Sequence, residues 1–292
     1  MKAFKDRPNA TTAYTVKSLV KALNILQVLA DEEPPYTLTE LSRRLHLHVS
    51  TVHRLLVNLV RHGFVEEDGV SGGYQLSYCV LRMGLRVLDR LDFRRAAHAL
   101  LRDLNLRTQE TVHLAILQET RAISIEKFDS PQPVGLDARL GGVMPLHCTG
   151  TGKTLLAYQG EELLEQIAQS PGLPRLTAHT LTSLPQLRRE LERIREQGYA
   201  VDQEEAVEGL SCVAGPVFNH TGQIVAAFSV AGPATRMTPA RVSEIIPMVR
   251  ETSQQISYRL GYRSEVRPAA APPGGSLRPE RGVPRGRTGN AG

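Results

Sequence analysis

The first 80 residues carry apolar side chains at helical spacing in three segments, followed by two short alternating ones. Apolar positions recur three and four residues apart from Val16 to Leu29, which predicts an amphipathic helix. Thr37 with Glu40 forms a capping-box pattern that opens a second helix, and a third follows a tight connection. We expect helices over 16–30, 37–45 and 50–62, and a glycine-tipped hairpin over 64–76. This succession predicts a winged helix-turn-helix.

Farther along the chain the apolar pattern predicts a second region that mixes strands with helices. Leucines at helical spacing predict a linker helix over 79–91 and a packed helix that runs to residue 104. Alternating apolar segments predict strands over 111–117, 122–128, 213–218 and 224–230. Helical spacing returns over 155–167, 184–197 and 239–260. We therefore assign the chain to the α+β class, with an antiparallel sheet flanked by helices.

The two ends of the chain differ in composition from the rest. Residues 1–12 are polar, and from Arg263 onward proline, glycine, alanine and arginine leave almost nothing to bury. We expect a flexible arm over 1–12, a winged helix-turn-helix domain over 13–78, a linker helix over 79–91, a C-terminal domain over 92–262 and a disordered tail over 263–292.

Composition narrows the class of protein. The 292 residues are 41% hydrophobic and 22% charged, which is typical of a folded domain with a sizeable core. The longest apolar stretches are far shorter than a membrane span, and the N-terminus has no apolar signal region. Three cysteines without C-x-x-C spacing favour reduced thiols. We therefore expect a cytoplasmic protein with no membrane partner.

The distribution of charge points to one segment rather than to the whole chain. The formal net charge is +5, but the tail over 263–292 holds six arginines and two glutamates and so supplies most of it. Residues 41–65 instead form a local cluster of four arginines and four histidines without an acidic residue. Such a cluster on a helix-turn-helix favours DNA binding over an ordinary solvated face.

The third helix is the candidate for reading DNA, because the second helix of a helix-turn-helix pair enters the major groove. Its N-terminal side chains that could reach bases or phosphates are Ser50, Thr51, His53 and Arg54. Arg54 could grip a guanine through two hydrogen bonds or clamp a phosphate. Arg43 and Arg44, on the preceding helix, suit contacts with the DNA backbone.

A glycine turn over 150–154, read Gly-Thr-Gly-Lys-Thr, resembles the end of a phosphate-binding loop. The full pattern, G-x-x-x-x-G-K-[ST], requires a glycine where His147 stands. A nucleotide-binding enzyme that uses Lys153 is therefore the alternative function, not the favoured one. A glycine turn that opens a helix, capped by Thr149 or Thr151, also presents N–H groups to a carboxylate. A capped helix start without any ligand is the third interpretation.

An acidic stretch over 198–217 contains Asp202, Glu204, Glu205 and Glu208. A carboxylate pair could serve acid–base chemistry, but no nucleophile motif accompanies it. We expect most of these side chains to form a solvated acidic loop. Zinc binding by His113, His147, Cys148 and Cys212 would need the fold to bring them together, because their spacing does not indicate it. We expect no metal, no cofactor and no catalytic residue.

Taken together, residues 13–262 resemble the IclR family of bacterial transcription regulators. The resemblance rests on "VKSLVKALNILQVLA", "LTELSRRLHLHVSTVHRLLVNLVRHGFV", "YQLS", "GVMPLHCTGTGKTLLAY", "GYAVDQEEAVEGLSCVAGPVFNHTGQIVAAFSVAGP" and "ISYRLGY". It implies a ligand-responsive regulator, a repressor rather than an activator. It also implies a DNA-binding homodimer, often paired into tetramers, with a GAF-like effector-binding domain over 92–262.

The same resemblance implies where the effector binds and what it is. Family effectors are small organic acids or aromatics, and three motifs line their pocket. Carried over to this chain, the pocket residues are Gly150, Thr151, Asp202, Cys212 and Ser229. Ala231 stands where some relatives have a second serine, which removes one polar contact. His46 stands where many have glycine in the helix-turn-helix turn, and histidine tolerates a positive φ better than most residues.

Overall fold

The computed structural model describes residues 15–31, 35–88, 91–133 and 139–263. The predicted arm over 1–12 lies outside the described residues, and so does the predicted tail over 263–292 apart from Arg263. Within those described, no helix is both long enough and apolar enough to span a bilayer.

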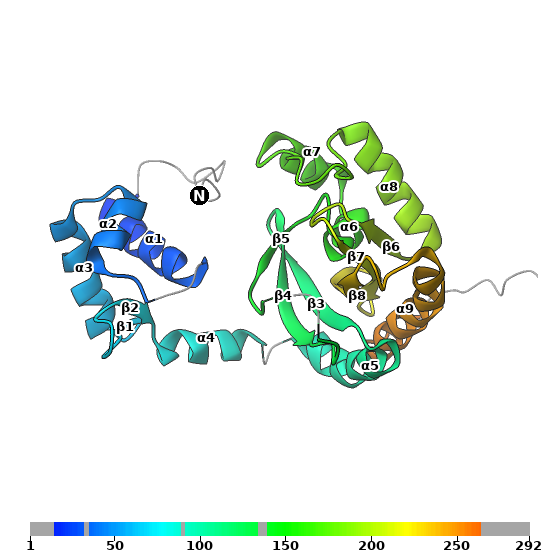
Figure 1. The fold of residues 1–292 in the computed structure, drawn as a ribbon, viewed down its shortest axis with the longest axis horizontal. Coiled ribbons are helices and arrows are strands. Elements are labelled where there is room, and N and C mark those ends of the chain that lie inside the picture. Colours follow the sequence, from blue (N-terminus) through cyan, green and yellow to red (C-terminus); the bar gives the residue numbers. More distant parts are fainter. Residues whose placement is uncertain (1–14, 32–34, 89–90, 134–138, 264–292) are drawn as a thin grey trace, which may run out of the picture. The chain divides into compact units, whose positions relative to one another are not determined.

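The N-terminal part contains the three predicted helices and the predicted hairpin (Figure 1). Helices α1 (Lys17–Asp31), α2 (Leu38–Leu45) and α3 (Val49–Arg61) precede strands β1 (Val65–Glu67) and β2 (Tyr74–Leu76), which pair antiparallel. Thr37 caps α2 with the predicted capping box: its hydroxyl accepts from the N–H of Glu40 at 3.3 Å, and Glu40 accepts from the N–H of Thr37 at 2.8 Å. Helix α3 begins one residue earlier than expected, after His48.

The turn between α2 and α3 adopts the geometry that the sequence predicted for His46. This residue has a φ of 52°, in the left-handed region, and its N–H donates to the carbonyl of Arg43. The turn lets both helices bury apolar side chains in one small core, formed by Ile25, Leu29, Tyr36, Leu41, Val52, Leu56 and Val65.

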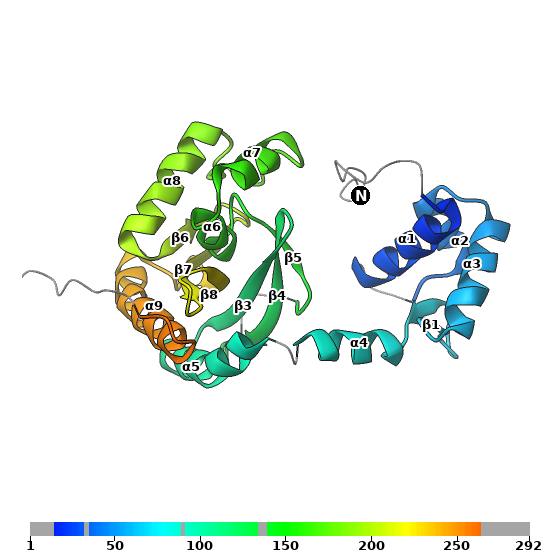
Figure 2. The same cartoon turned by 180° about the vertical axis from the view of Figure 1, so that it is seen from behind.

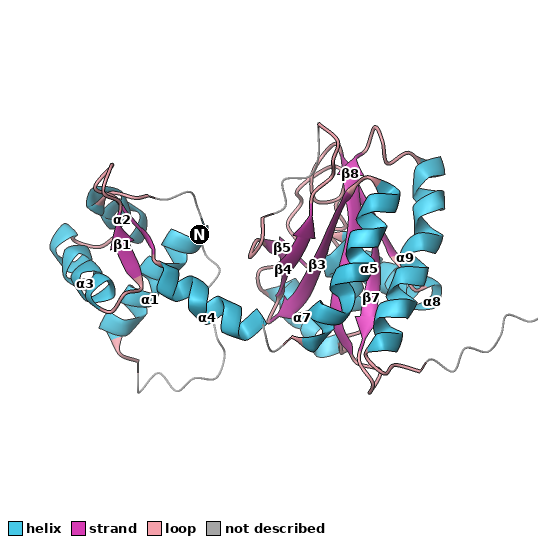
Figure 3. Cartoon of the chain, turned by 90° about the horizontal axis from the view of Figure 1, so that it is seen from below, coloured by secondary structure: helices cyan, strands magenta, loops and turns pink. Residues whose placement is uncertain are grey.

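Two helices, α4 (Tyr78–Leu88) and α5 (Asp92–Thr108), lead into the C-terminal part. Its sheet has six strands in the order β5-β4-β3-β8-β7-β6, and every neighbouring pair is antiparallel (Figure 3). The predicted hairpins are β3 (Thr111–Gln118) with β4 (Arg121–Phe128), and β7 (Leu210–Phe218) with β8 (Ile224–Pro233). The edge strands β5 (Val143–Pro145) and β6 (Ala200–Gln203) are additional to those predicted.

Helices cover both faces of this sheet (Figures 1 and 2). Helices α5 and α9 (Pro239–Arg259) pack on the face that carries Val213 and Phe228. Helices α6 (Gly150–Ala157), α7 (Glu161–Gln169) and α8 (Leu184–Gln197) lie on the opposite face, against Ala214 and Ala227. Because side chains alternate along a strand, successive residues of β7 pack against the helices on opposite faces of the sheet.

The single helix expected over 155–167 is wrong. The chain forms two helices here, because α6 ends at Ala157 and α7 begins at Glu161. Gly160 occupies the N-cap of α7 in an extended conformation, which interrupts the helix. Apolar spacing continues through the break, and so the pattern alone concealed it.

Candidate functional site

Helix α3 presents a polar face to solvent. Ser50, His53 and Arg54 are exposed and Thr51 is half-buried, whereas Val52 and Leu56 are buried in the small core. The core therefore fixes the helix by one face and leaves the opposite one available. Sequence reasoning missed Asn58, also exposed on α3, whose side-chain amide donates to the carbonyl of Arg54 at 2.7 Å.

The two arginines of α2 differ in their surroundings. Arg43 is exposed, whereas Arg44 is half-buried with its guanidinium 4.8 Å from the centre of the Tyr36 ring. A cation over an aromatic face is attracted by the negative face of the ring. Arg44 therefore has a packing partner in Tyr36.

In the C-terminal part, the N-terminus of α6 is fixed by Thr149. This hydroxyl accepts from the N–H of Gly152 at 3.1 Å and donates to the carbonyl of Pro145 at 2.7 Å. A Cβ on Gly152 would lie 2.4 Å from that same carbonyl oxygen, so only glycine fits. Thr149, one of the two caps that the sequence allowed, is the one used.

Two N–H groups of the first helical turn are already engaged. Gly152 donates to the hydroxyl of Thr149 and Lys153 to the carbonyl of Thr149. The hydroxyl of Thr151 is buried and has no hydrogen-bond partner among the described residues. An acceptor that reaches this turn would therefore meet Thr151 first.

Gly150, Cys212 and Asp202 are packed against one another. A Cβ added to Gly150 would lie 2.5 Å from Sγ of Cys212 and 3.8 Å from Cβ of Asp202. Cys212 and Asp202 are cross-strand partners in β7 and β6, with Sγ 4.0 Å from Oδ2. Two of the three predicted motifs thus meet at the start of α6.

The expected solvated acidic loop is wrong for Asp202 and Glu205, which are both buried. Oδ1 of Asp202 accepts from the N–H of Glu205 at 2.8 Å. Burial raises the pKa of the Asp202 carboxyl from 3.8 to about 7, because water no longer stabilises its charge. Glu204 is half-buried and Glu208 is exposed, as a loop position allows.

Ser229, from the third motif, lies on the same face of the sheet. Its hydroxyl is 3.3 Å from Nδ1 of His113 on β3, and burial lowers the pKa of His113 to about 4. Sequence reasoning considered His113 only as a zinc ligand, because a pairing across 116 residues leaves no local signal. Two adjacent rows of cross-strand partners form this face: His113, Ser229 and Ala214 in one, and Ala231, Cys212 and Asp202 in the other.

These predicted effector residues are closed off from solvent. Gly150, Thr151, Asp202, Cys212 and Ser229 are all buried. None of them lines the cavities of about 350 and 640 Å³ found elsewhere in this part. The face must therefore open before a ligand can enter it.

Lys153 does not extend toward a phosphate position. It is completely buried, and Nζ donates to Oε1 of Glu205, to the carbonyl of Val201 at 2.8 Å and to Oε1 of Glu190 at 3.5 Å. All three ammonium protons therefore have protein acceptors. This geometry disfavours the nucleotide-binding alternative.

Three of the four candidate zinc ligands have partners of their own: His113 with Ser229, His147 with Pro174 and Cys212 with Asp202. His147 pairs through Nε2 with the carbonyl of Pro174 at 3.1 Å, and burial raises the pKa of Cys148 to about 12. Among the residues that the structure describes, no three His, Cys, Asp or Glu side chains are grouped as metal ligands would be.

Comparison with known families matches both parts of the chain. The model of the IclR helix-turn-helix domain matches residues 18–69, and that of the bacterial transcriptional regulator IclR C-terminal domain matches residues 85–258. The HTH-type transcriptional regulator KdgR of Escherichia coli K12 is 37% identical over 248 residues, which cover 85% of this chain and 94% of KdgR. The HTH-type transcriptional repressor AllR of Salmonella typhi is 37% identical over 250 residues, covering 86% and 92% respectively.

Solved structures agree. The crystal structure of Thermotoga maritima IclR aligns with a TM-score of 0.68 at 33% identity, covering 85% of this chain and all of that one. An IclR homologue from Microbacterium hydrocarbonoxydans, complexed with 4-hydroxybenzoate, aligns with a TM-score of 0.74 at 26% identity, covering 83% and 98%. The chain belongs to the IclR family and is a helix-turn-helix transcription regulator, not an enzyme.

Proposed function

We propose that this regulator is a repressor whose operator binding responds to a small carboxylate or aromatic acid bound beside the N-terminus of α6. One observation carries the proposal: the buried hydroxyl of Thr151 has no partner within the described part of the chain, and it belongs to the turn that packs against Cys212 and Asp202. A buried hydroxyl without a partner costs free energy, which a ligand oxygen would recover.

A ligand carboxylate fits this face better when Asp202 is protonated. An ionised Asp202 would repel a carboxylate, whereas its raised pKa keeps a proton available near neutral pH. Ser229 and Cys212 would supply weaker polar contacts to the ligand. Ala231 leaves an apolar patch beside them, which suits an aromatic ring or a methyl group. The relative complexed with 4-hydroxybenzoate supports an acid of this kind.

On the DNA side, we propose that α3 enters the major groove. Ser50, Thr51, His53 and Arg54 would then face bases and nearby phosphates. Arg43 and Arg44 would contact the sugar–phosphate backbone, Arg44 in the orientation that Tyr36 imposes. A chromosomal operator implies that the protein works in the cytoplasm.

We also propose a homodimer, with pairing into a tetramer as the next level. Helix α4 exposes Tyr78, Leu81 and Leu85 on one face, each with about half or more of its surface accessible. A contiguous apolar face on a linker helix suits a two-fold contact with a second copy. A dimer also presents two reading helices to a palindromic operator. Leu85→Asp should shift the mass measured by light scattering toward the monomer, and an unchanged mass would remove α4 from the interface.

Thermal melts of the purified chain test the effector proposal. We expect 4-hydroxybenzoate, benzoate, or a short 2-oxo or 2-hydroxy acid to raise the melting temperature, because a ligand at 100 times its Kd stabilises the native state by ~2.7 kcal/mol. Thr151→Val should reduce that shift, whereas Thr182→Val, a change of the same kind outside the face, should retain it. An equal shift in wild type and Thr151→Val would contradict the proposed site.

A further inference from the structure

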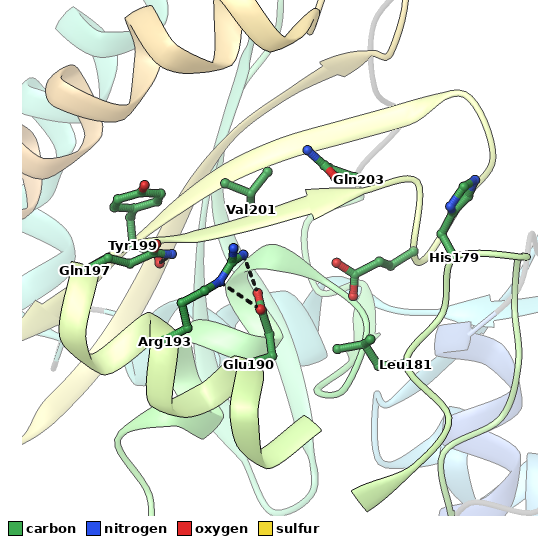
Figure 4. A pocket seen from close by; sticks show the side chains of 9 residues that line it. His179, Leu181, Glu190, Arg193, Gln197, Tyr199, Val201 and Gln203 are labelled. Atoms are coloured by element: carbon green, nitrogen blue, oxygen red, sulfur yellow. Dashed lines mark hydrogen bonds and ion pairs between the residues drawn. The ribbon is translucent and has the colours of Figure 1, made fainter. Parts of the chain in front are cut away.

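A cavity of about 350 Å³ lies apart from the proposed effector face, beside the edge strand β6. Its wall is built from α8, from β6 with the residue before it, and from the segment that precedes α8. Figure 4 shows Glu190 paired with Arg193 on α8, Tyr199 next to Gln197, and Gln203 farther along β6 on the side of His179. The volume is at the lower end of the range for small-molecule sites.

The charged groups of this cavity already balance one another. Oε1 of Glu190 accepts from Arg193 at 3.2 Å and from Lys153 at 3.5 Å, and Oε2 accepts from Nε of Arg193 at 3.1 Å. Lys153 also pairs with Glu205. Two cations therefore neutralise two carboxylates. A ligand with a net charge of either sign would add one uncompensated charge to this balanced set.

One strong acceptor at the cavity wall lacks a partner. Oε2 of Glu205 is shielded from solvent and, within the described residues, has no hydrogen-bond partner, so a donor in the cavity reaches it only after the wall shifts. Oε1 of the same carboxylate is taken by Lys153. A carboxylate oxygen of this kind calls for an O–H or N–H donor. Since the charges are balanced, that donor should belong to a neutral molecule.

The remaining lining combines hydrogen-bonding and apolar surface. Gln197 and Gln203 offer amides, His179 an imidazole, and Tyr199 and Leu181 apolar surface. Hydroxyl groups on one edge of a small ring would meet the carboxylate and the amides, while the C–H face of the ring would lie on Tyr199. We propose that this cavity binds a neutral monosaccharide or cyclic polyol, as a second ligand site separate from the effector face.

The proposal does not depend on the identity of the effector or on operator binding. The site adjoins the neighbourhood of Asp202 through Glu205, whose backbone N–H donates to Asp202, and through Lys153 of α6, which pairs with Glu190 and Glu205. A variant of the Gln203 side chain changes none of these contacts and therefore tests the cavity. Gln203 is exposed on β6 and lines the cavity, whereas Gln254 is exposed on α9 and does not.

Saturation-transfer NMR on the full chain, followed by calorimetric titration, tests the proposal. The probes are D-glucose, D-galactose, D-mannose, D-xylose, L-arabinose and myo-inositol, with putrescine and acetate as charged comparisons. We expect at least one neutral probe to bind, Gln203→Trp to weaken that binding at least tenfold by filling the cavity, and Gln254→Trp to leave it unchanged. His179→Trp fills the same cavity from the other wall. If the melting temperature of Gln203→Trp differs from that of wild type, the result with His179→Trp decides.

Three results would overturn the site. They are no binding by any of the six neutral probes, binding that persists in both tryptophan variants of the cavity, and displacement of the bound neutral probe by putrescine or acetate.

Discussion

The backbone N–H of Glu205 donates to Oδ1 of Asp202 at 2.8 Å, while the Glu205 side chain holds the ammonium group of Lys153. This short acidic turn therefore contacts two elements. At the end of β6 the carboxylate of Asp202 accepts from the backbone N–H of Glu205, and the carboxylate of Glu205 holds the buried Lys153 of α6. Helix α6, whose N-terminus lies at the proposed effector face, is thus held by the carboxylates that pair with Lys153.

The raised pKa of Asp202 predicts a specific dependence of stability on pH. The folded-state pKa of about 7 lies above the ordinary value of 3.8, so the folded protein holds more protons between these values than the unfolded chain does. Stability contributed by this group is present below pH 3.8 and is lost as the pH rises through about 7. Asp202→Asn removes this titration. Its free energy of unfolding should therefore rise relative to that of wild type, by on the order of 2–4 kcal/mol, as the pH increases between those two values.

Denaturant unfolding of both proteins at about pH 5 and about pH 8 checks this prediction. His113 acts in the opposite direction, because its folded-state pKa is lowered from 6.5 to about 4 and its stabilising effect is lost as the pH falls through that range. Because both proteins contain His113, the difference in their free energies of unfolding reports on the Asp202 carboxyl alone. A difference that does not change with pH would show that Asp202 is ionised throughout.

Lys153→Ala should destabilise the protein by about 3–5 kcal/mol, because it leaves the buried carboxylate of Glu205 without its cation. The double variant Lys153→Met with Glu205→Gln removes both charges and should recover part of that loss. Urea unfolding measures both effects. A single variant as stable as wild type would mean that the lysine and glutamate do not form a buried pair.

The same lysine gives a test of nucleotide binding. We expect ATP with magnesium to leave the melting temperature unchanged, because the three ammonium protons of Lys153 already have acceptors. A shift with ATP that disappears in Lys153→Arg would restore nucleotide binding as a property of this turn.

Gly150→Ala should cost about 1–3 kcal/mol, because the new Cβ would lie 2.5 Å from Sγ of Cys212. Cys212→Ala removes that sulfur and should relieve part of the cost in the double variant. The coupling free energy from the double-mutant cycle is the measured quantity. Strictly additive effects would show that the two residues are not in contact.

Arg54→Ala should weaken binding to a selected operator duplex by about 1–3 kcal/mol at fixed salt if the side chain grips a base. Arg102→Ala, which removes an exposed arginine from α5, is the matched control and should change little. Gel shifts with duplexes selected from genomic fragments provide the measurement. If both variants bind alike, Arg54 does not read the operator.

Local signals explain which parts of the fold could be predicted. The capping box at Thr37, the positive φ of His46 and the strands on either side of the turn at Asn219 depend on residues a few positions apart. Each could therefore be read from the sequence. The edge strands β5 and β6 span only 3 and 4 residues, too few to establish an alternating pattern.

The candidate site depends on distant residues, and here the sequence was less informative. Nothing local distinguishes the buried Asp202 and Glu205 from the exposed Glu208. Glu205 is buried against Lys153, a distant residue of the chain that needs acceptors, and Asp202 is buried where β6 pairs with β7 beside Gly150. The pairing of His113 with Ser229 likewise depends on the register of β3 against β8. The five effector residues came from family resemblance, and their role stays a prediction.

The central claim is that an acid bound beside Thr151 changes the affinity for DNA. Fluorescence anisotropy of a selected operator duplex, titrated with the chain with and without a saturating acid from the melting screen, tests it most directly. We predict that the acid changes the Kd by about fivefold or more in wild type, and by less in Thr151→Val. An identical Kd with and without an acid that demonstrably stabilises the protein would contradict the account.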